Sequence, residues 1–168
     1  MTYSTNEILE LIREVKHTPE MESDHELILI LDKKVSLEEI VWDSLKELVK
    51  HPSSYLRCNL ACRKDLPETM MEDLANDSSW EVRELLAQNP NLPKSLIEFL
   101  SKDRADLVRE GIAKHPNLPE SLIPILAKDK NLWVRGWLAM RKDIPDALRK
   151  TFSKDESPIV RNMLELIS

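Results

Sequence analysis

Glycine is almost missing from this chain of 168 residues, which contains only Gly111 and Gly136. Average usage is about 7%, so glycine-rich phosphate loops, dinucleotide-binding turns and glycine-dependent β-hairpins are disfavoured. No apolar run approaches the ~20 residues that a membrane-spanning helix needs. Leu, Glu and Lys are abundant instead, and these residues favour helix. The composition predicts an all-α protein without a membrane span.

Cysteine is scarce as well, and basic residues do not outnumber acidic ones. Cys58 and Cys62 are the two cysteines, and the N-terminal stretch MTYSTNEILELIREVK is charged and amphipathic, unlike a secretory signal. These features predict a reducing, cytoplasmic setting. The net charge is −6: residues 1–52 carry 12 acids and 6 Lys or Arg, and residues 53–168 carry 18 of each. This balance weighs against a nucleic-acid partner, which usually meets a basic domain.

A repeat of 26 residues is the strongest pattern in the chain. The phrase NPNLPKSLIEFL, which begins at Asn89, returns as HPNLPESLIPIL, which begins at His115. A fixed period of 20–50 residues indicates stacked supersecondary units. The recurring columns are Val82, Val108, Val134 and Val160; Arg57, Arg83, Arg109, Arg135 and Arg161; Asp77, Asp103, Asp129 and Asp155, with His51 in the first repeat; and Pro67, Pro93, Pro119 and Pro145.

Each repeat is predicted to contain two helices. The proline column suits the first turn of a first helix, where the missing N–H costs nothing. The Asp column marks the turn and can cap the second helix, which ends before the proline of NPN or HPN. Pro124 lies inside a first helix and should kink it or remove a hydrogen bond. The predicted repeats are 40–65, 66–91, 92–117, 118–143 and 144–168. An acidic N-terminal cap, 1–39, precedes them. Within this cap, the pattern of residues 24–34 does not distinguish helix from strand.

The pattern DxxxxVRxxLAxNPNLPxxLIxxLAxD resembles the leucine-rich repeat variant, a bacterial family of helical repeats. The Asp-to-Arg spacing of six is also similar to HEAT repeats. The resemblance covers residues 40–168 and implies a right-handed α-solenoid of five 26-residue helix pairs with an N-terminal helical cap. The founding leucine-rich repeat variant protein carries an iron–sulfur cluster on N-terminal cysteines. Residues 1–39 contain no cysteine, so the resemblance implies no cluster, and we predict neither a cofactor nor a metal site.

Several side chains are candidates for chemical sites. The Arg column is either a row of anion-binding groups or, as in HEAT-like stacks, one half of a ladder to the Asp column of neighbouring repeats. Arg57 has no Asp in its own repeat, so it either pairs forward or faces solvent. Cys58 and Cys62 are spaced like two metal ligands, with His51 and His25 as further candidates, or are small buried apolar residues. No catalytic set assembles, so the sequence predicts a protein that is not an enzyme.

Positions at which the repeats differ are the candidates for binding. One second-helix column reads Tyr55, Glu81, Leu107, Trp133 and Ile159, and four residues further another reads Asn59, Leu85, Gly111, Trp137 and Met163. Trp and Arg are enriched in interface hot spots, although aromatic residues on such a stripe also fill the space between helices. The partner-binding candidates are Tyr55, Glu81, Glu84, Glu110, Trp133, Trp137, Met140 and Arg141.

The favoured function is a protein- or peptide-binding repeat scaffold that uses a concave face of second helices. The three glutamates among the candidates favour a partner with basic and apolar groups. A first alternative is a nucleic-acid-binding protein, because HEAT-like repeats include glycosylases for alkylated bases. It would need a basic, aromatic groove made by Trp133, Trp137, Arg135, Arg141, Lys142 and Arg149. A second alternative is a structural subunit whose end repeats dock on other chains.

Overall fold

The computed structural model describes residues 46–166, apart from the side chain of Glu47. The predicted cap 1–39, including the stretch 24–34, lies outside these residues. The chain divides into two compact units, Met1–Asn91 and Leu92–Ser168. The division falls at the boundary between the predicted repeats 66–91 and 92–117.

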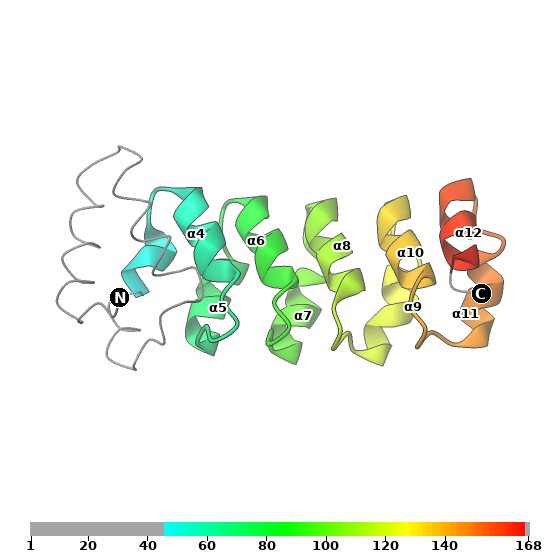
Figure 1. Cartoon of the computed structure of the whole chain (residues 1–168), viewed down its shortest axis with the longest axis horizontal. Coiled ribbons are helices and arrows are strands. Elements are labelled where there is room, and N and C mark those ends of the chain that lie inside the picture. The colour runs from blue at the N-terminus through cyan, green and yellow to red at the C-terminus, as the bar shows by residue number, and fades with distance from the viewer. Residues whose placement is uncertain (1–45, 167–168) are drawn as a thin grey trace. The chain divides into compact units, whose positions relative to one another are not determined.

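The described part of the first unit contains a 3-10 helix and three α-helices. η1 (Lys46–Lys50) and α4 (Ser54–Ala61) belong to one repeat, and α5 (Glu68–Ala75) and α6 (Trp80–Ala87) belong to the next. The second helices α4 and α6 pack against each other, and α5 packs against both η1 and α6 (Figure 1). Their core consists of large apolar side chains at helical spacing: Leu48, Leu56, Leu60, Met70, Leu74 and Leu86.

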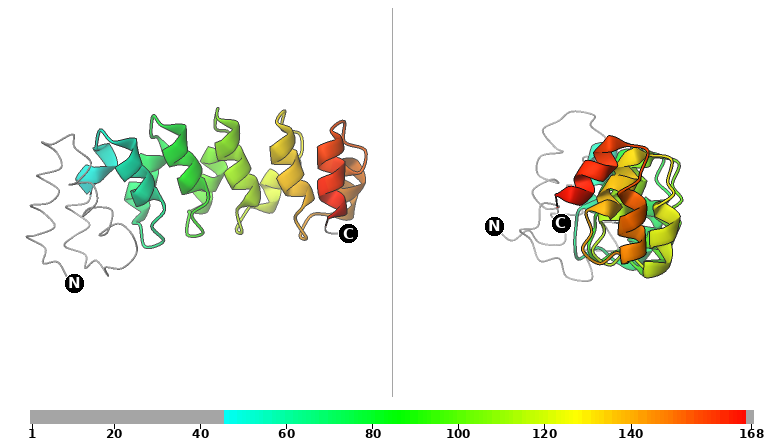
Figure 2. Two further views of the ribbon diagram at one scale, coloured as in Figure 1. Left: turned by 45° about the horizontal axis from the view of Figure 1, so that its top comes forward. Right: turned by 90° about the vertical axis from the view of Figure 1, so that its right-hand side faces the viewer.

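The second unit contains three repeats. α7 (Lys94–Leu100) precedes α8 (Asp106–Lys114), η2 (Glu120–Leu122) and α9 (Ile123–Leu126) precede α10 (Leu132–Ala139), and α11 (Asp146–Phe152) precedes α12 (Pro158–Glu165). α10 packs between α8 and α12, so these second helices form one row, while α7, α9 and α11 form another (Figures 1 and 2). Every described residue is helical or in a connection, with no strand between residues 46 and 166, which confirms the all-α prediction and the helix pairs.

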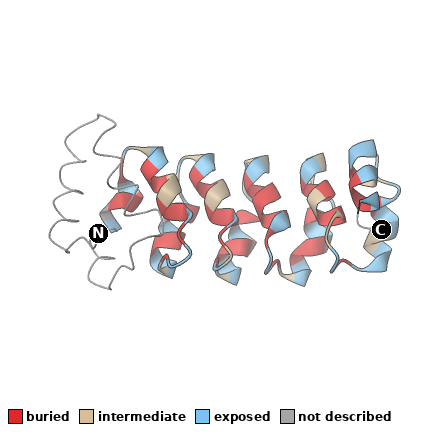
Figure 3. Ribbon diagram, viewed as in Figure 1, coloured by how far each residue is buried: buried red, intermediate tan, exposed pale blue. Residues whose placement is uncertain are grey.

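The burial pattern follows the repeat. The valine column is fully buried, together with Ile112, Leu138 and Phe152, while the turns and helix ends carry most of the exposed residues (Figure 3). At about 25 cal/mol per Å² of apolar surface, such burial is the main stabilising contribution of each helix pair.

The prolines of the repeat lie at the N-cap of the first helix that follows them, one residue before the first helical position that the sequence predicted. Pro67, Pro93 and Pro145 occupy N-cap positions with extended ψ values of 145°, 147° and 147°, and the helices begin at the following residue. The carbonyl of Pro67 accepts hydrogen bonds from the N–H groups of Met70 and Met71, at 3.0 and 3.1 Å. A residue at this position supplies a carbonyl rather than an N–H to the first turn, so proline is tolerated here for the same reason as at the first helical position.

The Asp column shapes the turn rather than capping the second helix directly. The Oδ1 atoms of Asp77, Asp103 and Asp129 each accept the N–H of the residue two positions on, at 2.8 Å. His51 replaces aspartate in the first repeat, and its Nδ1 accepts the N–H of Ser53 at 3.1 Å. This is the turn that short polar side chains form with their own backbone. The N-cap itself follows two residues later.

Pro124 breaks its helix as predicted. The segment begins as the 3-10 helix η2, in which Leu122 N–H donates to the carbonyl of Pro119 at 2.9 Å. Only then does the short helix α9 start, with Pro124 in its first turn. The missing N–H of proline therefore falls where an α-helix has no internal acceptor.

Candidate partner-binding face

A ladder of arginine and aspartate joins neighbouring repeats within each unit. Arg57 contacts both carboxylate oxygens of Asp77, with Nε–Oδ2 at 2.6 Å and Nη2–Oδ1 at 2.9 Å. Arg135 makes the same two-point contact with Asp155, at 2.8 and 2.9 Å. Arg57 therefore pairs forward rather than facing solvent. These contacts confirm the ladder interpretation of the two columns, because the guanidiniums are buried and paired rather than open to an anion.

The ladder also sets the protonation of its members. The hydrogen bond with Asp129 raises the pKa of Arg109 further above its usual value, against the effect of burial. Burial alone would raise the pKa of Asp129, but the hydrogen bonds from Arg109 and from the N–H of Asn131 outweigh it, and this pKa lies below its usual range. The hydrogen bond from Arg135 lowers the pKa of Asp155 in the same way. Both partners are thus charged at neutral pH, as a paired buried salt bridge requires.

A second set of contacts between repeats, here called the second ladder, lies at the C-terminal ends of the second helices. Asn89 Nδ2 donates to the carbonyls of Ala61 and Arg63, at 3.2 and 2.7 Å. Arg141 occupies the same repeat position and donates through Nη1 to the carbonyls of Ala113 and His115, at 3.2 and 2.8 Å. These carbonyls end the preceding second helix, where four C=O groups lack an internal partner. The repeat pattern does not reveal this second ladder, because different residue types make the same contacts in different repeats.

Arg141, a binding candidate, therefore has a structural role. Its Nε and Nη2 atoms bind the two carboxylate oxygens of Asp143 at 2.9 and 2.6 Å, and its side chain is 12% exposed. Arg149 donates to the carbonyls of Arg141 and Lys142, at 3.0 and 3.1 Å. With Arg135 paired to Asp155, the three guanidiniums of the predicted basic groove are all bonded to the protein itself.

Three of the exposed apolar side chains of the second unit lie on its second helices, while Phe99 and Ile125 lie on first helices. Leu107 on α8, Trp133 on α10 and Ile159 on α12 are 45%, 44% and 39% exposed and occupy one repeat position. Their helices pack side by side. We call these three residues the apolar row. The sequence had placed them in one column, but only Trp133 was among the binding candidates.

Trp137 on α10 and Met140 at its C-cap are half-buried, so they are less exposed than the apolar row. The ammonium group of Lys114, at the end of α8, lies 4.1 Å from the centroid of the Trp137 ring. This is a cation–π geometry. Gly136 lets α12 approach, because a Cβ at this position would lie 2.5 Å from the sulfur of Met163. The two tryptophans thus differ in role: Trp137 packs across the helix row, while Trp133 faces solvent.

The remaining candidates divide by exposure. Tyr55 and Glu81, in the first unit, are exposed, and Glu81 accepts a hydrogen bond from the hydroxyl of Ser79 that lowers its pKa. Glu84 is half-buried and accepts a hydrogen bond from Gln88. Glu110 is buried, with 8% of its surface exposed. Glu110 therefore does not offer the surface negative charge on which the expectation of a basic partner partly depended.

The cysteines and histidines form no cluster in the described region. Cys58 is half-buried on α4 and Cys62 is exposed at its end, and neither of these two cysteines forms a disulfide. Burial raises the pKa of Cys58, which makes it a poorer nucleophile and ligand. Among residues 46–166 no three His, Cys, Asp or Glu side chains lie together as metal ligands. His25 lies outside these residues.

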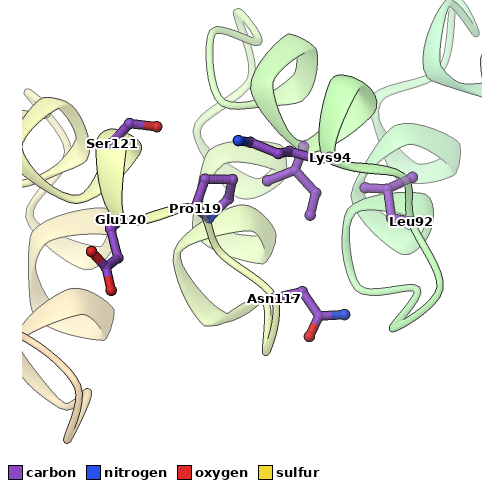
Figure 4. Close-up of a pocket in the computed structure, with 7 residues that line it drawn as sticks. Leu92, Lys94, Asn117, Pro119, Glu120 and Ser121 are labelled. Carbon is purple, nitrogen blue, oxygen red and sulfur yellow. The ribbon is translucent and has the colours of Figure 1, made fainter.

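A cleft lies on the first-helix side of the second unit, between the starts of α7 and η2 (Figure 4). Its volume is about 480 Å³. Ser121 supplies a hydroxyl and Glu120 a carboxylate, but no hydrogen bond joins these two side chains, so the cleft holds no nucleophile paired with a base. The residues that line it are Leu92, Lys94, Ile97, Asn117, Pro119, Glu120 and Ser121.

The chain is similar to a solved structure described as a leucine-rich repeat variant with a novel repetitive structural motif. The two are 22% identical, with a TM-score of 0.62, and the match covers 97% of this chain but 66% of the other. No family model and no curated protein matches the sequence. The likeness shows an all-helical α-solenoid fold, as the sequence pattern predicted. None of the described helices has the length and apolar character needed to cross a bilayer.

Proposed function

We propose that this protein is a non-enzymatic scaffold that binds a protein or peptide through the second-helix face of its second unit. The observation that carries the proposal is the apolar row. Three large apolar side chains at one repeat position stay in solvent on three adjacent helices. Isolated exposed apolar residues are common, whereas a contiguous apolar patch marks an interaction site.

The contrast with the neighbouring columns supports this proposal. Val108, Val134 and Val160 immediately follow the apolar row in the sequence, and each is fully buried. One apolar column therefore forms the core, while the column before it, the apolar row, stays exposed to solvent. Trp133 is the residue of this row best suited to anchor a partner, since tryptophan buries a large rigid surface at low entropic cost.

The charged columns support a binding role rather than chemistry. Arg109 and Arg135 are committed to Asp129 and Asp155, so the ladder offers no free acid, base or anion site on this face. The nucleic-acid alternative loses support for the same reason, because Arg135, Arg141 and Arg149 are bonded within the protein. Cys58 and Cys62 are not joined in a disulfide, which fits a reducing, cytoplasmic setting.

Capture of partners tests the proposal. The full chain would be immobilised in native-cell lysate as wild type, as the face variant Trp133→Ala/Ile159→Ala and as the control variant Phe99→Ala/Ile125→Ala. The control residues are 51% and 57% exposed but lie on first helices. We expect a protein that wild type and the control retain and the face variant loses.

Circular dichroism and thermal unfolding of all three proteins show whether they are folded equally well. Equal retention by the three would place the binding surface elsewhere. Absence of any retained protein would remove the support for a scaffold role.

A further inference from the structure

A row of cations lies beside the apolar row. It consists of exposed residues in the turns that lead into α8, α10 and α12, and part of it recurs with the 26-residue period. We call it the cation row. Its members are Lys102, Arg104, Lys128, Lys130 and Lys154.

The cation row differs from the arginine column because its side chains form no ion pairs with the residues that the structure describes. Within the described residues none of its five side chains forms an ion pair, whereas Arg109 and Arg135 do. Of the nearby acids, Asp106 binds Arg109 at 2.6 Å, and Glu156, whose side chain is 86% exposed, lies 3.2 Å from Arg135. Exposed ion pairs contribute little to stability, and the cation row lacks even these, so its charges are available to a partner.

The two rows are close in sequence and therefore in space. Arg104 and Lys130 each precede a member of the apolar row by three residues, which limits the Cα–Cα distance to about 11 Å. Lys114 stands at the opposite end of α8, over Trp137. The apolar row is thus bordered by positive charge at both ends of this helix.

We propose that the second-helix face of the second unit binds an acidic segment of another protein, in which apolar residues alternate with carboxylates. The apolar side chains would cover Leu107, Trp133 and Ile159, and the carboxylates would lie against the cation row. This inference rests on the proposed scaffold function and names its partner class. It replaces the expectation of a basic partner, which depended partly on Glu110, a buried residue.

The spacing of the helices restricts the segment further. Adjacent packed helices lie about 8–10 Å apart, so the members of the apolar row recur at that distance. An extended chain in the polyproline II conformation repeats every three residues and rises about 9.3 Å per turn. A segment with an apolar residue at every third position therefore matches the row, and the two residues between them carry the acids.

A nucleic acid would also meet cations, but the apolar row argues against it. Bases stack on aromatic side chains, and two of the three row members, Leu107 and Ile159, are aliphatic. Carboxylates interspersed with aliphatic side chains match both rows at once. An oligonucleotide is therefore included below as a competing ligand.

The test measures fluorescence anisotropy of labelled probes with the full chain. The probes are a peptide of four Leu-Asp-Glu triplets, its basic counterpart of Leu-Lys-Lys triplets, an acidic peptide of Ser-Asp-Glu triplets, and an oligothymidylate of equal length. We expect the Leu-Asp-Glu peptide to bind at least about tenfold more tightly than the other three at low salt. Its affinity should fall as salt is raised, since exposed charges are screened.

Two matched variants test whether the cation row supplies the charges that bind the acidic peptide. Lys128→Glu/Lys130→Glu reverses two members of the cation row, and Lys142→Glu/Lys150→Glu makes the same change at exposed positions outside it. We expect the first to weaken acidic-peptide binding by about tenfold or more and to raise affinity for the basic peptide. The second should stay within about twofold of wild type, because the contacting charges are unchanged.

Preference for the basic peptide or the oligothymidylate, no binding of the Leu-Asp-Glu peptide, or equal effects of the two charge reversals would overturn the inference. The scaffold proposal is tested separately by capture. If captured protein is lost with Trp133→Ala/Ile159→Ala but kept with Lys128→Glu/Lys130→Glu, the scaffold function stands and the acidic partner class is wrong.

Discussion

The guanidinium of Arg109 contacts both carboxylate oxygens of Asp129, twenty residues further along the chain, at 2.7 and 2.9 Å. Its third nitrogen, Nη1, donates to the carbonyl of Asp103 in its own repeat at 2.7 Å. One side chain thus holds two turns together, each at the start of a second helix. Because Arg presents its donors in a rigid fork, this geometry fixes the register between neighbouring repeats.

Neutralising Asp129 should destabilise the protein. In Asp129→Asn, Oδ1 still accepts the N–H of Asn131, but Arg109 loses a buried countercharge and keeps the ion pair with Asp106 and the hydrogen bond to the carbonyl of Asp103. We expect a loss of about 2 kcal/mol in the free energy of unfolding, below the ~3–5 kcal/mol of a fully broken buried pair because Arg109 keeps its other contacts. Urea denaturation measures it. Glu72→Gln, an exposed change on α5, serves as the control and should stay within about 0.5 kcal/mol.

The same pair predicts how stability depends on pH. The pKa of Asp129 is lower in the folded protein than its usual value, which is about 3.9 in an unfolded chain. Its stabilising contribution is therefore complete above that value and is lost as the pH falls through the folded pKa. The stability difference between wild type and Asp129→Asn should be constant from pH 7 to about pH 5 and shrink below about pH 4. A difference that grows on acidification would contradict the pairing.

Replacement of Arg141 tests the second ladder. Arg141→Leu leaves the carbonyls of Ala113 and His115 without this donor, and we expect a loss of about 2 kcal/mol. Arg141→Asn should cost less, because Asn89 makes the equivalent contacts in the first unit. Urea denaturation of both variants gives the order. A larger loss for Asn than for Leu would mean that the carbonyl contacts contribute little.

The sequence predicted the parts of the fold that recur. The Val, Arg and Asp columns kept their spacing because every repeat needs the same core and the same ladder contacts. It could not assign the variable positions, because their exposure depends on the neighbouring helix. Trp133 and Trp137 lie one turn apart on α10, yet one is open and the other lies beneath Lys114. Glu110 is buried while Glu84, its counterpart one repeat earlier, is half-buried.

Replacing Pro124 should make its helix continuous. The equivalent residues Glu72 and Glu98 lie within the uninterrupted helices α5 and α7, so Pro124→Glu restores a residue type that the position accepts. The gain in helical hydrogen bonding exceeds the entropy advantage that proline gives through the unfolded chain. We expect an increase of about 1 kcal/mol in the free energy of unfolding, with more helix by circular dichroism. Pro119→Ala, at an N-cap, should produce neither change.

Gly136 and Met163 should be energetically coupled. An alanine Cβ at position 136 would lie 2.5 Å from the Met163 sulfur, so Met163, which is 8% exposed, must move. Alanine favours a helix interior over glycine by about 1 kcal/mol, whereas overpacking costs about 1–3 kcal/mol. Gly136→Ala should therefore destabilise wild type by about 1 kcal/mol.

The same substitution should stabilise a Met163→Ala background, because the space that alanine needs is then empty and only the helix preference remains. A double-mutant cycle by urea denaturation measures the coupling, which we expect to be at least about 1 kcal/mol. Equal effects in both backgrounds would show that the methionine shifts freely. The close approach of α10 and α12 would then not depend on glycine.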